Sequence, residues 1–304
     1  MSQRFTLGSK ASKWLMLPGL VSGLVLVGLG WWHRDNLSVS SQVSASTMVA
    51  PPTTPTASPV PEFGVRHQLT YAEWVRVLAQ EATAIARQQP AHLHILAGDS
   101  LSLWFPPGLL PARATWLNQG ISGETSYGLL QRLQGFDQTQ PQVIFVMIGI
   151  NDLIQGVGDA TLLANQQEIV AHLKAAHPQS RIVMQSILPH GGDRARQRYL
   201  ASIAGSPVPP VRPKWVDRLP KISPQRLQRL NQQLAAIAHQ EQVEFLNLYD
   251  LFLGEDNLIR PELTTDGLHL SAEGYAVWRS QLEQVMATSP QTATTPAERY
   301  HISP

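Results

Sequence analysis

Residues 93–101 read LHILAGDSL, an apolar run that ends in glycine, aspartate and serine. A short apolar run before a glycine is typical of a buried strand. Because glycine lets the backbone turn sharply, we expect Ser100 at the end of this strand, where it opens the next helix. There its hydroxyl and its backbone N–H would both face a ligand. The alternative is a serine that only caps a turn or a helix, since a four-residue motif alone is weak evidence.

Further apolar runs along the chain have the same character. Residues 143–149, VIFVMIG, are apolar throughout, as expected of a central strand in a parallel sheet. Other strands are predicted at 115–118, 181–188 and 243–248, and helical patterns at 70–88, near 124–135, 160–176 and 224–240, and at 271–286 with Ser271 as N-cap. This alternation predicts an α/β fold whose parallel sheet is covered on both faces and whose ligand site lies beyond the carboxyl ends of the strands.

Three more polar segments follow predicted strands. Residues 118–125, NQGISGET, hold two glycines around a serine, which permits a tight loop with N–H groups facing a ligand. In GIND, 149–152, the amide of Asn151 can donate a hydrogen bond to a developing oxyanion. In TDGLHLS, 265–271, Asp266 and His269 can meet, so that the carboxylate orients an imidazole able to deprotonate a serine.

These four segments, in this order, resemble the four blocks of the SGNH (GDSL-type) hydrolase family, most of all its lysophospholipase-like and arylesterase-like bacterial branch. The resemblance covers about residues 93–287. It implies a three-layer sandwich with a central parallel sheet, the flavodoxin-like arrangement. It also implies a catalytic triad of Ser100, Asp266 and His269, and an oxyanion hole formed by Ser100, Gly123 and Asn151. None of these five positions departs from the family pattern.

The resemblance implies hydrolysis of a carboxylic ester, in a lipid or an O-acylated or O-acetylated glycan, through an acyl-enzyme. It calls for no cofactor and no metal. Two other functions stay open: transfer of the acyl group to an envelope polysaccharide, and non-catalytic binding of a glycan or lipid. A GxSxG nucleophile elbow is absent, which disfavours the α/β-hydrolase family. The HGG sequence at 190–192 is interpreted as a turn, because it follows the wrong strand for an oxyanion loop.

The N-terminal region predicts a membrane anchor. Residues 14–32 carry no charge, and at about 1.5 Å per residue they reach roughly 28 Å, close to the thickness of a bilayer core. Basic residues before this span and tryptophans at its ends favour a cytoplasmic N-terminus, residues 1–13, and an extracytoplasmic enzyme. Residues 33–65, rich in Ser, Thr and Pro, are typical of a linker. A cleaved signal peptide, and with it secretion, is the alternative.

The hydrolase domain is placed at 66–287, followed by a flexible tail at 288–304. Within it, residues 190–222 form a basic, proline-rich insertion. This insertion emerges beyond a strand's carboxyl end, so we expect either a flap over the site or a solvated excursion on its rim. A basic flap would favour an anionic substrate, such as a phospholipid headgroup or an acidic glycan, with a salt-dependent KM.

Composition limits the remaining choices. A net charge of +1 disfavours a nucleic-acid partner, and the absence of cysteine excludes disulfides, thiolate metal sites and cysteine nucleophiles. His172, His177 and His239 lack metal-ligand spacing and are predicted at the surface. The residues after the nucleophile line an acyl pocket or belong to a helix core, and both alternatives stay open: Leu101, Leu103, Trp104, Phe105 and Pro106.

Overall fold

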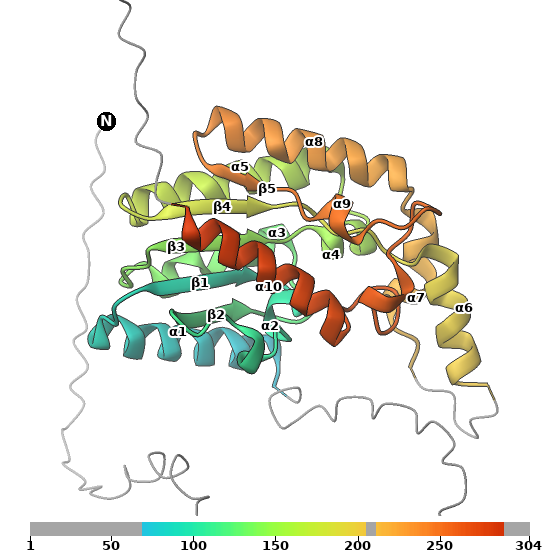
Figure 1. Ribbon diagram of the computed structural model, residues 1–304, viewed down its shortest axis with the longest axis horizontal. Coiled ribbons are helices and arrows are strands. Elements are labelled where there is room, and N and C mark those ends of the chain that lie inside the picture. Colours follow the sequence, from blue (N-terminus) through green and yellow to red (C-terminus); the bar gives the residue numbers. More distant parts are fainter. Residues whose placement is uncertain (1–68, 205–210, 289–304) are drawn as a thin grey trace, which may run out of the picture. The chain divides into compact units, whose positions relative to one another are not determined.

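The computed structural model describes residues 69–204 and 211–288, and its centre is one sheet of parallel strands (Figure 1). The strands are β1 (Leu93–Gly98), β2 (Thr115–Gly120), β3 (Val143–Met147), β4 (Arg181–Gln185) and β5 (Glu244–Leu246). Their order is β2-β1-β3-β4-β5, and every neighbouring pair is parallel. This is the flavodoxin-like order, so the predicted doubly wound α/β fold is confirmed.

Helices cover both faces of the sheet. The described helices are α1 (Tyr71–Gln88), α2 (Ser100–Leu103), α3 (Ser126–Arg132), α4 (Ile150–Gln155), α5 (Asp159–Ala176), α6 (Gly192–Ser202), α7 (Lys214–Arg218), α8 (Pro224–Gln240), α9 (Tyr249–Phe252) and α10 (Ala272–Ala287). Short 3-10 turns lie between them at Pro107–Leu109, Leu133–Phe136, Leu219–Lys221 and Pro261–Leu263. Figure 1 shows α10 crossing one face, with α1, α3, α5 and α8 on the other side.

The two-residue period of the strands divides the core between these faces. In β3, Phe145 and Met147 join a cluster with Trp278 and Leu282 of α10. Their neighbours Ile144 and Val146 point the other way, into a cluster with α1, α3 and α5. Because both faces of the central strand are buried, its sequence is a continuous apolar run rather than an alternating one.

Most predicted elements appear within a few residues of their expected bounds. Helix α8 spans the predicted residues, and α1 begins after Thr70, whose side chain and Glu73 form a capping box. Ser271 is the N-cap of α10 as predicted, accepting a hydrogen bond from the N–H of Gly274. The predicted strands at 181–188 and 243–248 are shorter in the structure, because the N–H groups of Ile187 and Leu248 bond the side chains of Asn231 and Ser186 instead of a neighbouring strand.

The described part of the chain contains no helix long and apolar enough to cross a membrane. The predicted N-terminus, anchor and linker, 1–13, 14–32 and 33–65, lie outside the described residues, as does the tail from residue 289 on. These assignments stay predictions.

Candidate active site

The turn that carries Ser100, the predicted nucleophile, lies at the carboxyl end of β1 and is called the nucleophile turn below. Asp99 caps α2, and its Oδ1 accepts a hydrogen bond of 3.0 Å from the N–H of Leu101. Ser100 is therefore the first residue of a four-residue helix, as expected from its strand-to-helix position. Gly98 permits this turn, because a Cβ at this position would collide with the carbonyl oxygen of Met147 on β3.

The second predicted segment forms a loop after β2. Gly123 has a φ of +77°, a left-handed conformation that favours glycine. The next residue, Glu124, is buried and pairs with Arg132 of α3 at 2.6 Å. The Arg132 guanidinium also donates to the carbonyl oxygens of Gly98, at 3.3 Å, and Gln119, at 2.8 Å. One buried arginine thus joins the nucleophile turn to the glycine loop.

The third segment follows β3. Asn151 lies in the first turn of α4, and its Nδ2 is 3.4 Å from Oδ2 of Asp99. The next residue, Asp152, accepts hydrogen bonds from the backbone N–H of Ser126, at 2.8 Å, and from its hydroxyl, at 2.5 Å. Because Ser126 lies three residues after Gly123, this contact fixes the Asn151 turn relative to the glycine loop.

The fourth segment contains the Asp–His pair. Nδ1 of His269 and Oδ2 of Asp266 are 2.7 Å apart, while Oδ1 accepts the N–H groups of Leu268 and His269, both at 2.8 Å. Burial opposes the negative charge of Asp266, but these hydrogen bonds and the His269 ring outweigh it and lower the pKa of the carboxyl. Since Nδ1 faces the carboxylate, Nε2 is the ring nitrogen left for a nucleophile.

Trp104 places this pair beside the nucleophile turn. It directly follows α2, and its ring centre lies 4.1 Å from that of His269, with the planes tilted by 40°. The structure therefore brings together the segments that hold Ser100, Gly123, Asn151 and the Asp266–His269 pair. All of them stand at the carboxyl edge of the sheet, where open α/β folds bind ligands.

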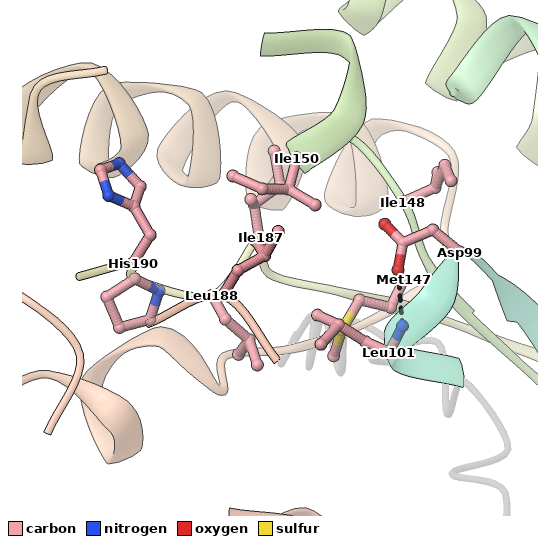
Figure 2. A pocket seen from close by; sticks show the side chains of 10 residues that line it. Asp99, Leu101, Met147, Ile148, Ile150, Ile187, Leu188 and His190 are labelled. Carbon is pink, nitrogen blue, oxygen red and sulfur yellow. Dashed lines mark hydrogen bonds between the residues drawn. The ribbon is translucent and has the colours of Figure 1, made fainter. Parts of the chain in front are cut away.

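A small apolar cavity of about 10 Å³ lies under this site (Figure 2). Its polar lining residues are Asp99 and His190. The other lining residues are apolar: Leu101, Met147, Ile148, Ile150, Ile187, Leu188, Pro189 and Leu268. Figure 2 shows the Asp99 carboxyl among aliphatic side chains, with its hydrogen bond to Leu101 dashed. Burial in these surroundings raises the pKa of Asp99 to about 7.

Several expectations for neighbouring residues are decided by burial. Leu101 and Phe105 belong to the core cluster under α10, so for these two the helix-core alternative holds. The surface assignment of His177 is wrong: this side chain is buried and stacks on Phe136, with ring centres 5.8 Å apart. Its position at the C-terminal cap of α5 turns it toward the core. His239 is exposed as predicted, and His172 is half-buried against Asp137.

The HGG sequence, interpreted as a turn, leads straight into α6, with Gly191 as N-cap and Gly192 as the first helical residue. Sequence reasoning missed the residues that support the site, namely Asp99, Glu124, Arg132 and Asp152. Their signals are weak, because a charged residue inside an amphipathic helix or loop looks like a solvated one. The position of Arg132 between leucines, in LLQRLQ, is the one local hint of burial.

The sheet is doubly wound, and a serine, an Asp–His pair and hydrogen-bond donors lie at the ends of its strands. This combination is typical of serine hydrolases. Residues 96–277, more than half of the chain, match the model of the GDSL-like lipase/acylhydrolase family. The chain belongs to this family and is a serine ester hydrolase.

Solved structures agree in fold. A Streptococcus pneumonia protein described as a platelet activating factor is 24% identical, with a TM-score of 0.55, over 74% of this chain and all (100%) of that one. A GDSL-like lipase from Bacteroides thetaiotaomicron VPI-5482 is 22% identical, with a TM-score of 0.53, over 70% of this chain and 96% of the lipase. A Bacteroides fragilis NCTC 9343 protein described as an acylhydrolase is 20% identical, with a TM-score of 0.53, over 72% of this chain and 97% of that protein. No curated protein matches the sequence.

Proposed function

We propose that Ser100, His269 and Asp266 form a catalytic triad that hydrolyses a carboxylic ester through an acyl-enzyme. The observation that carries this proposal is the Asp266–His269 pair. Its carboxylate is held by two backbone N–H groups and presents its second oxygen to the imidazole at 2.7 Å. A carboxylate fixed in this way sets the ring tautomer and stabilises the imidazolium that forms during the reaction.

The reaction follows from these positions. Nε2 of His269 takes the proton of the Ser100 hydroxyl while Oγ attacks the ester carbonyl carbon. The oxyanion is stabilised by the backbone N–H groups of Ser100 and Gly123 and by the Asn151 amide. His269 returns the proton to the leaving alcohol as its C–O bond breaks, leaving Ser100 acylated. Water, deprotonated by His269, then releases the acid and restores the serine.

The substrate class is a carboxylic ester of a lipid or of an O-acylated or O-acetylated glycan. The insertion supports an anionic member of this class. Arg194, Arg196 and Arg212 pair with aspartates, whereas Lys214, Arg218 and Lys221 are exposed and have no carboxylate partner among the described residues. Helix α7, which carries Lys214 and Arg218, packs against α4, the helix of Asn151. The nearness of α7 to α4 and the exposure of these cations support an anionic substrate.

We also propose a membrane location, with residues 14–32 as a single uncharged anchor and the enzyme outside the cytoplasm. Alkaline carbonate extraction of membranes tests this. An anchored chain stays in the pellet, and a variant with four leucines of the segment changed to serine moves to the supernatant. Recovery of the unaltered chain in the supernatant would contradict the anchor.

The test of the triad is hydrolysis of p-nitrophenyl esters, from acetate to palmitate, by the full chain and by Ser100→Ala. Turnover lost in Ser100→Ala supports the proposal, and the chain-length optimum separates deacetylation from lipid cleavage. Ser102→Ala is the matched control, because this buried hydroxyl two residues away has no hydrogen-bond partner within residues 69–204 and 211–288. Turnover by Ser100→Ala close to that of the parent would overturn the assignment.

A fluorophosphonate that labels active serines separates the remaining alternatives. A chain that hydrolyses no ester but is labelled at Ser100 would be an acyltransferase awaiting its acceptor. A chain that is neither active nor labelled would be a binding module.

A further inference from the structure

The insertion that begins at His190 contacts the loop that carries Asp266 and His269. The backbone N–H of Gly191 donates a hydrogen bond of 2.7 Å to the carbonyl oxygen of Gly267. Gly267 lies between Asp266 and Leu268 and has a φ of +92°, so the loop turns there through a conformation that favours glycine. The two segments are more than seventy residues apart in the sequence, so the fold brings them together.

Small side chains make this approach possible. A Cβ added at Gly267 would overlap the Cβ of Ala195 on α6 and lie 3.1 Å from its Cα. A Cβ added at Gly191 would lie 3.0 Å from both the Ala195 Cβ and the Gly267 Cα. Gly191, Ala195 and Gly267 thus form one close contact with no spare volume, and interiors packed in this way transmit a change of one methyl group.

Two further contacts join the insertion to the loop on either side of Gly267. Leu268, next to His269, is buried in a cluster with Ala195 and with Leu219 and Ile222 from the far end of the insertion. On the other side of Gly267, an Arg198 Nη1–H donates to the carbonyl oxygen of Thr265 at 3.2 Å. The insertion therefore contacts the catalytic loop at three successive places between Thr265 and Leu268.

We propose that Gly191 and Ala195 are positioning residues, and that α6 braces the Asp266–His269 loop in its reactive geometry. This inference rests on the proposed function. His269 must hold its Nε2 at the serine hydroxyl, and a displacement of about 1 Å at a catalytic group can cost about 100-fold in rate. The insertion then serves the reaction through the fit of α6 against Gly267, in addition to any role of its cations in substrate binding.

The test is Ala195→Val in the full chain, with Gln197→Val as the matched control. Both variants add a β-branched residue to α6, but Gln197 is exposed, whereas Ala195 is buried against Gly267. Because the added methyl groups push on Gly267, we expect kcat to fall by about 10- to 100-fold and KM to change less than about twofold. The rate of Ser100 labelling by a fluorophosphonate should fall in proportion, since it reports activation of the serine without ester binding.

All rates are measured at a temperature where circular dichroism shows each variant folded. If Ala195→Val does not fold, Gly191→Ala replaces it, because its added Cβ would lie 3.0 Å from both the Ala195 Cβ and the Gly267 Cα. A kcat of the folded variant equal to that of Gln197→Val, or a loss confined to KM, would overturn the inference. Failure of the proposed function would show separately, as turnover that survives in Ser100→Ala.

Discussion

Nδ2 of Asn151 lies 3.4 Å from Oδ2 of Asp99, the residue immediately before Ser100. Asp99 thus orients one amide hydrogen of Asn151, and in the proposed mechanism the second hydrogen donates to a carbonyl oxygen at Ser100. The same carboxyl caps the helix that Ser100 opens. One side chain therefore sets the relative position of the proposed nucleophile, Ser100, and the proposed oxyanion donor, Asn151.

Asn151→Ala should lower kcat by about 10²–10³ with little change in KM. The reason is that a donor to the oxyanion contributes mainly in the transition state, where the carbonyl oxygen carries its charge. Steady-state hydrolysis of a p-nitrophenyl ester measures both constants. Asn247→Ala, which changes an asparagine in another loop of the same sheet edge, is the control. A KM increase at constant kcat would instead assign Asn151 to substrate binding.

Asp99→Asn should change how stability depends on pH. Burial raises the pKa of Asp99 to about 7, so between about pH 4 and pH 7 the folded chain holds a proton that the unfolded chain has released. This carboxyl therefore contributes stability that is present at low pH and is lost as the pH rises through that window. The upper bound is about 4 kcal/mol, at about 1.4 kcal/mol for each pH unit of the shift.

Urea unfolding of the parent and Asp99→Asn at pH 4, 5, 6 and 7 measures this contribution as a difference. The difference between the two chains cancels the contributions that other titrating groups make to the pH dependence of stability. His94 and His190 are among these groups, and their lowered pKa values make stability rise with pH. The free energy of unfolding of Asp99→Asn should rise relative to that of the parent as the pH rises. A difference that is constant over the range would contradict the prediction.

Arg132→Met should destabilise the protein by about 3–5 kcal/mol, because it leaves the Glu124 carboxylate buried without its cation. Adding Glu124→Gln should recover part of that loss, since the variant then holds no unpaired charge. Urea unfolding at one pH gives the four corners of this double-mutant cycle. Arg113→Met is the control at an exposed arginine and should stay within about 0.5 kcal/mol of the parent. An Arg132→Met chain as stable as that control would mean that the ion pair contributes nothing.

Raising salt from about 0.1 M to 1 M shortens the screening length from roughly 10 Å to 3 Å. If the exposed cations of the insertion attract the substrate, KM should rise for an ester with a carboxylate on its acyl chain and stay constant for its neutral counterpart. Changing Lys214, Arg218 and Lys221 to glutamine should remove the difference. The control changes Arg76 and Arg87 of α1 to glutamine. An equal salt response for both esters would exclude this role.

Local patterns explain which parts of the fold and the site could be predicted. A strand that ends in Gly98 and Ser100, or an Asp266–His269 spacing on one loop, is visible within a few residues. The contact of Gly191 with Gly267 is not, because it depends on how two distant loops pack. Likewise, only the leucines around Arg132 hint that the Glu124–Arg132 pair is buried rather than on the surface. The two alternatives left open for the insertion, a flap over the site or a solvated excursion on its rim, both omitted its packing on the loop of Asp266 and His269.

Asp266→Asn tests the role of the Asp–His pair most directly. The two backbone N–H groups that bind Oδ1 would hold the remaining carbonyl oxygen of the asparagine, so its NH₂ group would face Nδ1 of His269. The ring would then have to accept at Nδ1 and carry its proton on Nε2, which leaves no lone pair to deprotonate Ser100. By analogy with the same change in a serine protease triad, kcat should fall by about 10⁴. Asp250→Asn, at an exposed aspartate bonded to Asn247, is the control. If kcat fell less than about tenfold while the fold stayed intact, the carboxylate would not be setting the tautomer, and His269 would have to be oriented by Trp104 and the loop backbone alone.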